Sequence, residues 1–162
     1  MPVPAVIAAA ADNYRFNSDF LVKMVQDLTP EEWTRRPEGA TNHIAWIVGH
    51  VVWTRKQLLA RLGAEWSLPW LDLFGRGVKC DDTAAYPSPG ALIDGWREVS
   101  GVLAATLETA SEEALSQPST KGPPSTDGKV SGVVSFLAIH ETYHIGQASY
   151  LRAWLGHKGL MG

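Results

Sequence analysis

The feature that most constrains the fold is a helical repeat, of about 3.6 residues, in the apolar positions of four long segments. These segments cover residues 4–28, 41–62, 88–110 and 130–155. No segment of similar length shows the strict apolar and polar alternation of a half-buried strand. We therefore predict an all-α fold, a four-helix up-down bundle with long loop connections. Because 162 residues suit one hydrophobic core, we expect a single domain over 1–162.

Local residue preferences mark the ends of these helices. The Thr41-Asn42 pair offers side-chain oxygens that can cap the second helix, and Gly63 is suited to end it. The Ser88-Pro89 pair is typical of a helix start, and Gly156 of a helix end. Residues 29–32, which read Thr-Pro-Glu-Glu, predict a short helical turn closed by a capping box.

The connection over residues 64–87 is long and unusually aromatic. Connections of this length without a helix of their own are uncommon and are usually functional or disordered. An apolar cluster gives this one a reason to pack against the bundle, and we interpret it as a packed lid over a site. The cluster contains Trp66, Leu68, Trp70, Leu71, Leu73 and Phe74.

Composition and charge exclude several functional classes. There are 14 Lys+Arg against 17 Asp+Glu, giving a net charge of −3, which disfavours nucleic acid as a partner. No segment has the ~20 uninterrupted apolar residues of a membrane span, and the N-terminal stretch lacks the charged start of a signal peptide. The single cysteine, Cys80, forms no internal disulfide and suits a cytoplasmic location. We do not expect Cys80 to be catalytic.

Three of the five histidines interrupt apolar helix faces. His140 and His144 lie four residues apart, on one face of the last helix, in the middle of its apolar stripe. His50 interrupts the apolar face of the second helix in the same way. A lone buried histidine is more often a hydrogen-bonded core residue than a ligand, but three would each need a separate partner. Since facing helices bring core side chains together, we predict a tris-histidine site for a divalent metal ion.

The two remaining histidines are weaker candidates. His43 shares a face with His50 but lies about 10.5 Å away along the helix, at about 1.5 Å per residue. We expect it to bind a backbone group or solvent near the helix start instead of the same ion. His157 follows the Gly156 stop, and we expect it at the surface.

Residues 140–144 also match the pattern H-E-x-x-H, which in zinc peptidases supplies two ligands and a glutamate base. No Asp or Glu follows His144 to serve as a downstream carboxylate ligand. The metzincin extension requires Gly at position 147, where this chain has Gln147. We therefore do not expect peptidase activity.

Four further residues are candidates for the surroundings of the metal. Gln147 shares the ligand face, where its amide could orient a histidine or a substrate, or form an interhelical hydrogen bond. Glu141 could support a ligand or simply be solvated. Tyr143 could reach the rim of the site as a proton donor, or pack. Trp46 lies on the apolar face of the second helix beside His50 and is a candidate pocket residue.

Two segments carry a resemblance to a known family. Residues 42–50 read Asn-His-Ile-Ala-Trp-Ile-Val-Gly-His, and residues 140–147 read His-Glu-Thr-Tyr-His-Ile-Gly-Gln. With the terminal 151–156 segment and the order of elements, they resemble the DinB-like superfamily of four-helix metal proteins over nearly the whole chain. The resemblance implies that His50, His140 and His144 hold zinc or nickel, and that the protein forms a homodimer. Many members carry a basic residue after the second histidine of the last helix, whereas this chain has Ile145.

The superfamily includes thiol-dependent S-transferases, a maleylpyruvate isomerase and many members with no known reaction, so fold alone does not give activity. Our leading hypothesis is a cytoplasmic metalloenzyme that binds a low-molecular-weight thiol on a tris-histidine ion and transfers it to a small-molecule electrophile. One alternative is a non-catalytic metal-binding or stress-related bundle protein. Another is a metal-free carrier of a hydrophobic ligand.

Overall fold

Four long helices dominate the fold, which we describe from a computed structural model covering residues 2–38 and 42–161. They are α1 (Ala8–Val25), α2 (Ile44–Arg61), α3 (Pro89–Thr109) and α5 (Val130–Trp154). The short helix α4 (Glu112–Ser116) and three 3-10 turns, η1 (Ala5–Ile7), η2 (Glu32–Thr34) and η3 (Leu71–Phe74), lie in the connections. No strand occurs in the described residues. The predicted all-α, four-helix architecture with long connections is therefore confirmed.

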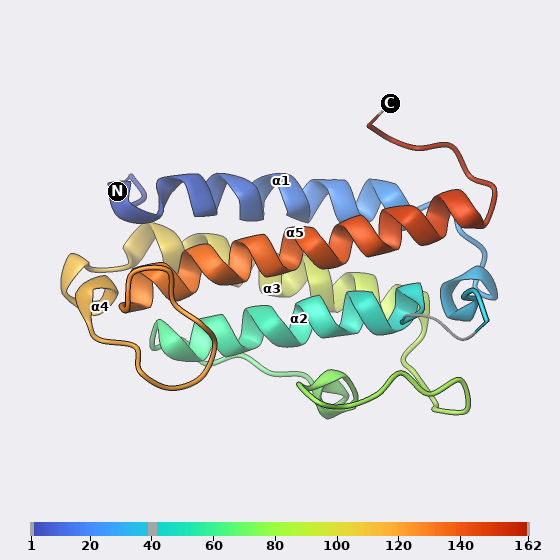
Figure 1. Cartoon of the computed structure of the whole chain (residues 1–162), viewed down its shortest axis with the longest axis horizontal. Coiled ribbons are helices and arrows are strands. Elements are labelled where there is room, and N and C mark those ends of the chain that lie inside the picture. The colour runs from blue at the N-terminus through green and yellow to red at the C-terminus, as the bar shows by residue number, and fades with distance from the viewer. Residues whose placement is uncertain (1, 39–41, 162) are drawn as a thin grey trace.

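The helices run in the order up, down, down, up, which differs from the alternating up-down order predicted from the sequence. Figure 1 shows α1 and α5 running in one direction and α2 and α3 in the other. The connection over residues 62–88 causes this arrangement, because it returns along the length of the bundle before α3 begins. As a result α2 and α5 are antiparallel neighbours, which is the relation that brings the histidine-bearing faces together.

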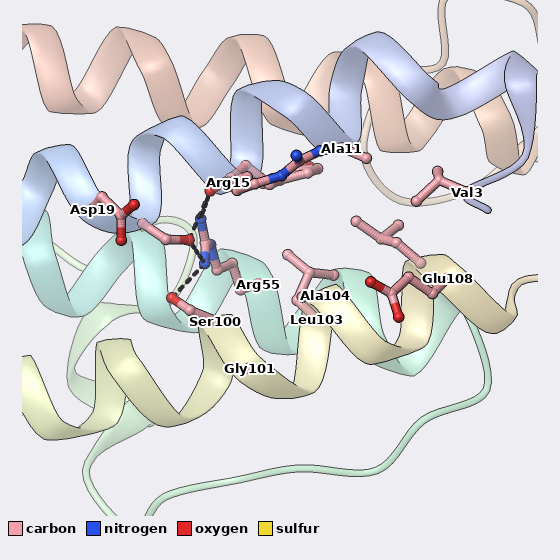
Figure 2. A pocket seen from close by; sticks show the side chains of 13 residues that line it. Val3, Ala11, Arg15, Asp19, Arg55, Ser100, Gly101, Leu103, Ala104 and Glu108 are labelled. Carbon is pink, nitrogen blue, oxygen red and sulfur yellow. Dashed lines mark hydrogen bonds between the residues drawn. The ribbon is translucent and has the colours of Figure 1, made fainter. Parts of the chain in front are cut away.

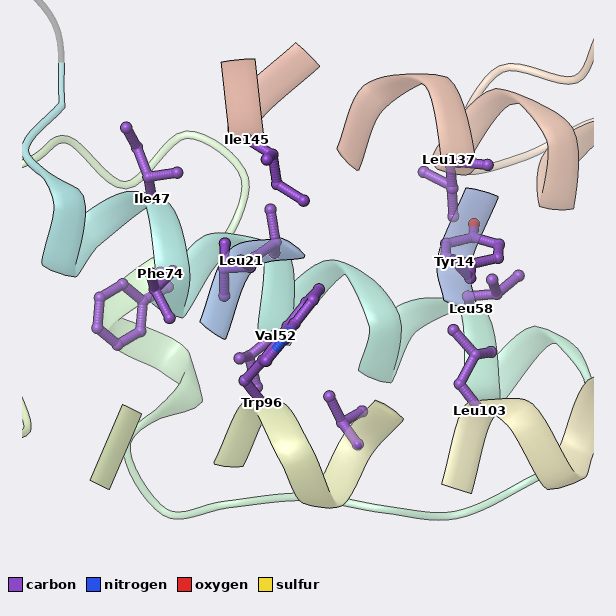
Figure 3. Close-up of a cluster of buried hydrophobic side chains, with 14 of the residues drawn as sticks. Tyr14, Leu21, Ile47, Val52, Leu58, Phe74, Trp96, Leu103, Leu137 and Ile145 are labelled. Atoms are coloured by element: carbon purple, nitrogen blue, oxygen red, sulfur yellow. The ribbon is translucent and has the colours of Figure 1, made fainter. Parts of the chain in front are cut away.

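The core is built from the apolar stripes of all four helices. Figure 3 shows side chains from α1, α2, α3 and α5 meeting in its interior, with Phe74 of the long connection among them. Trp96 is fully buried, and its indole Nε1 donates to the carbonyl of Ser18 at 3.0 Å. Burial contributes about 1.5–3 kcal/mol for each large apolar side chain, so this layer supplies most of the force that holds the helices together.

The helix ends largely follow their local signals. Ser88 Oγ accepts from Ala91 N at 3.2 Å, and the Glu32 carboxylate accepts from Thr29 N at 2.8 Å. Gly63 and Gly156 both take positive φ angles, +79° and +94°, as expected of residues that end helices.

The start of α2 differs from the prediction. Thr41 lies outside the described residues, and Asn42 does not cap the helix. Instead His43 is the N-cap, and its Nδ1 accepts from Trp46 N at 3.0 Å. An imidazole nitrogen replaces the side-chain oxygen that usually satisfies this N–H group.

The 62–88 connection packs on the bundle, as the aromatic cluster predicts. Phe74 and Leu71 are buried, and the Phe74 ring lies on Gly49, where an added Cβ would approach it to 2.3 Å. Trp70 makes the same kind of close approach to Gly95 of α3. The connection is thus fixed to α2 and α3 by contacts that only glycine permits. No helix in the described part of the chain is long and apolar enough to cross a bilayer.

Candidate metal centre

Helices α2 and α5 bring His50, His140 and His144 to one point. One ring nitrogen from each lies within 4.8 Å of the other two. The Nε2 atoms of His140 and His144 are 3.1 Å apart, close to the ~3.3 Å between two ligands of one tetrahedral zinc at 2.0–2.1 Å bonds. The three predicted ligands therefore form a buried group that could hold a metal ion.

Hydrogen bonds orient two of the rings. His50 Nδ1 lies 2.7 Å from the carbonyl oxygen of Phe74, which only accepts, so Nδ1 carries the proton. His144 Nδ1 donates in the same way to Gln147 Oε1 at 2.8 Å. Both rings consequently keep the Nε2 lone pair for the centre of the group, and lone pairs that face each other require a cation or a proton between them. The donor set thus fits a divalent metal ion.

Burial keeps these imidazoles neutral. It lowers the pKa of His50 and of His140, and it lowers the pKa of His144 to about 4, with further lowering from the nearby His50 and His140. A neutral imidazole is the form that binds metal. At pH 7 the group is therefore ready to coordinate without first losing protons.

Two indoles fix the His50 ring from its own helix. Trp46 stacks on it with ring centroids 4.7 Å apart, and Trp53 stacks at 5.7 Å. The structure therefore places Trp46 directly against a candidate ligand. His140 is less enclosed than His50 and His144, and its buried Nδ1 has no hydrogen-bond partner among the residues that the structure describes. The group lies at the edge of the core and not in the fully dry interior that the sequence pattern suggests.

Glu141 is turned away from the histidines. It neither supports one of them nor lies in solvent, so both roles considered from the sequence were wrong. It is fully buried and forms an ion pair with Arg55 of α2, with Oε2 2.6 Å from Nε and Oε1 2.8 Å from a terminal nitrogen. Asn17 of α1 also donates to Oε1 at 3.1 Å. The sequence reading missed Arg55, although a charge within the apolar run of α2 was a signal for a buried partner.

The structure corrects the packing alternative for Tyr143 and the surface position expected of His157. Tyr143 is 62% exposed, so it does not pack in the core; its hydroxyl accepts from Gln147 Nε2 at 3.1 Å. His157 is half-buried, with Nε2 3.0 Å from a carboxylate oxygen of Glu32. This contact ties the segment after α5 to the η2 turn, because the chain turns at Gly156, where φ is +94°.

Ligand-type atoms of His43, Cys80 and Asp82 also lie within 4.8 Å of one another. Here the imidazole of His43 already caps α2. His43 Nδ1 accepts from Trp46 N, so the proton is on Nε2, which then has no lone pair for a metal. Asp82 is also paired with Arg36 at 3.0 Å. The chemistry of this group favours a helix cap over a metal site.

A pocket of about 460 Å³ opens beside the candidate metal group and includes His50 and His140 in its lining. Its apolar walls come from Trp53, Phe136 and residues 123–124. The aromatic cluster over 66–74 does not line it, so the predicted lid forms no wall of this pocket. The contribution of the cluster is indirect, since the Phe74 carbonyl holds His50.

A second cavity, of about 530 Å³, lies between α1 and α3 (Figure 2). Arg55 is its buried cation, but all five of its N–H donors are used. Two go to Glu141, two to the hydroxyls of Ser18 and Ser100, and one to the carbonyl of Tyr14. Because the donors of Arg55 are already used and no histidine lines this cavity, it is the weaker candidate for a functional site.

Comparison with known families agrees with this geometry. The sequence model of the DinB superfamily matches residues 14–148, which include all four long helices in whole or in part and all three candidate ligands. The chain belongs to the DinB superfamily. No curated protein gives a match to this member of the superfamily.

Proposed function

We propose that this DinB superfamily protein is a metal-dependent enzyme in which His50, His140 and His144 hold a divalent ion, zinc or nickel. The observation that carries the proposal is the convergence of three ring nitrogens, with the tautomers of His50 and His144 already set by Phe74 and Gln147. Three protein ligands are the number found in catalytic zinc sites, where a further position stays open.

We further propose that the substrate is a low-molecular-weight thiol together with a small electrophile. A divalent ion supplies positive charge that lowers the pKa of a bound thiol and keeps it as a nucleophilic thiolate. The chain itself supplies neutral, oriented imidazoles and a pocket of about 460 Å³, which is within the usual range for small-molecule sites.

The alternative function is a structural ion without catalysis. Helices α2 and α5 are already joined by the buried Arg55–Glu141 pair and by the core, which favours the catalytic role. Chelation separates the two functions. An exchangeable catalytic ion predicts a small fall in Tm after metal removal, whereas a structural ion predicts a large one because bound metal contributes folding energy.

Metal analysis and a thiol-conjugation screen test the proposal together. Purified protein should hold about one divalent ion per chain, and alanine at any one of the three histidines should abolish both the ion and turnover. The screen should use bacillithiol, mycothiol and glutathione. Full transferase activity in a metal-free triple variant would refute the assignment, and no conjugation with any thiol would favour the structural ion.

A cytoplasmic homodimer is also part of the proposal. The support for the dimer is an exposed apolar stripe on α5, formed by Ile139, Tyr143, Tyr150 and Trp154 at exposures of 61%, 62%, 66% and 42%. Light scattering should give twice the monomer mass, and a monomer at micromolar concentration would contradict it.

A further inference from the structure

The charge of the pocket beside the histidines differs from that of the chain as a whole. The chain carries a net charge of −3, yet the pocket includes two arginines, Arg61 and Arg76, and no carboxylate among its lining residues. An excess of positive charge in a concave, partly apolar site attracts and orients anions. We infer that this pocket binds a small organic carboxylate with an apolar or aromatic body, an inference that rests on the proposed function in taking the pocket as the substrate site.

The two arginines have different roles. Arg61 is held by the loop before α5, since it donates to Ser119 Oγ at 3.3 Å and to the Lys121 carbonyl. This places residues 123–124 as a wall of the pocket and keeps a guanidinium charge there. Arg61 is therefore the positioning arginine, and its charge is a permanent part of the pocket.

Arg76 is the arginine available to a ligand. It is exposed, and in the described residues it has neither an ion pair nor a hydrogen bond. It follows Phe74 by two residues, so the contact that holds His50 also places Arg76 at the pocket. A planar guanidinium with unused donors binds a carboxylate through two parallel hydrogen bonds.

The rest of the pocket indicates the body of the ligand. Trp53 and Phe136 supply aromatic surfaces, and Leu137 and residues 123–124 add apolar contact. Gln57 also lines the pocket and makes no hydrogen bond within the described parts of the chain, so its amide is available to a polar substituent. Such a lining suits a flat apolar group that carries one acid at its edge.

Calorimetric titration with matched probes tests this inference. The probes are 1-naphthoate, neutral 1-naphthamide and cationic 1-naphthylmethylamine, each titrated into zinc-loaded protein and into protein freed of metal and then desalted. We expect naphthoate to bind about tenfold more tightly than naphthamide, and the amine most weakly, in both forms of the protein. The preference should shrink as NaCl is raised, because salt screens exposed charges.

Substitution of the exposed arginine locates the effect. Arg76→Gln should bring the affinity for naphthoate to within about threefold of that for naphthamide, while leaving naphthamide binding unchanged. Arg97→Gln is the matched control, since Arg97 is exposed on α3 and is not part of the pocket lining; it should change neither affinity.

Three results would overturn the inference: equal affinities for acid and amide, a preference that stays at about tenfold in Arg76→Gln, or no binding of either probe at millimolar concentration. The metal-free arm keeps this result separate from the proposed function. Protein that holds no metal can still show the arginine-dependent preference, and protein that holds zinc can still lack it.

Discussion

The buried Arg55–Glu141 ion pair gives the sharpest prediction about stability. Both side chains are 1% exposed, and the pair joins α2 to α5 next to His140. Glu141→Leu removes the acceptor of two of the five N–H donors of Arg55 and leaves its charge buried without a counter-ion. Asn17 loses one of its two acceptors as well.

The magnitude follows from this geometry. Breaking a buried pair by removing one partner costs about 3–5 kcal/mol, because the remaining charge is not compensated. In a chain of this size each kcal/mol lowers Tm by about 2–4 °C, so we expect a fall of roughly 6–20 °C. Removing both charges, in Arg55→Met with Glu141→Leu, should recover most of the loss. Ser18 and Ser100 keep their own backbone acceptors, so the double variant strands no hydroxyl.

Urea unfolding of metal-free protein, followed by far-ultraviolet circular dichroism, measures these differences directly. Arg97→Gln, which removes an exposed arginine, is a control and should change the free energy of unfolding by less than about 0.5 kcal/mol. Two results would refute the reasoning. One is a cost below about 1 kcal/mol for Glu141→Leu, and the other is a double variant no more stable than that single variant.

Three further predictions concern the surroundings of the histidines. Gly49→Ala should destabilise the protein by about 1–3 kcal/mol in the same urea assay and weaken zinc binding, because the added Cβ would displace Phe74, whose carbonyl holds His50. Gly101→Ala is the control, since the space around Gly101 is open, and it should be neutral or stabilising. Gln147→Leu should weaken zinc affinity by about 10–100-fold in a chelator competition, and an unchanged affinity would exclude an orienting role. Burial lowers the pKa of His43 from 6.5 to about 4, so between these pH values the imidazole binds a proton in the unfolded chain but not in the folded one. The free energy of unfolding should therefore fall by about 1.4 kcal/mol per pH unit as the pH decreases through this range, relative to His43→Asn. Parallel pH profiles of stability for the two proteins would contradict this.

The sequence predicts the all-α fold and the convergence of the three histidines because both depend on local periodicity. A histidine in an apolar stripe is visible in the sequence, and the antiparallel pairing of two amphipathic helices then brings His50 near His140 and His144. The direction of α3 was not predictable in this way. A helix stripe is the same in either direction, and only the path of the 62–88 connection decides between them.

The wrong expectations concern residues whose partners are distant in sequence. Glu141 is 86 residues from Arg55, and the sequence around either residue does not indicate that the other is its partner. The aromatic cluster over 66–74 shows that it must pack, but not on which surface. It packs on Gly49 and Gly95, because these small residues leave hollows in α2 and α3 that no pattern of apolar spacing records. Arg61 and Arg76 were not predicted as pocket residues, because the rest of the pocket comes from segments distant in the sequence.

The ion pair also explains why the H-E-x-x-H pattern does not predict a peptidase here. A glutamate base needs a free carboxylate oxygen directed at the metal-bound water. In this chain both oxygens of Glu141 accept hydrogen bonds from Arg55, and Asn17 occupies one of them further. Instead, Glu141 joins α2 to α5 at the level of the three histidines. The histidines are thus positioned by the fold itself, which fits the exchangeable ion of the proposed function.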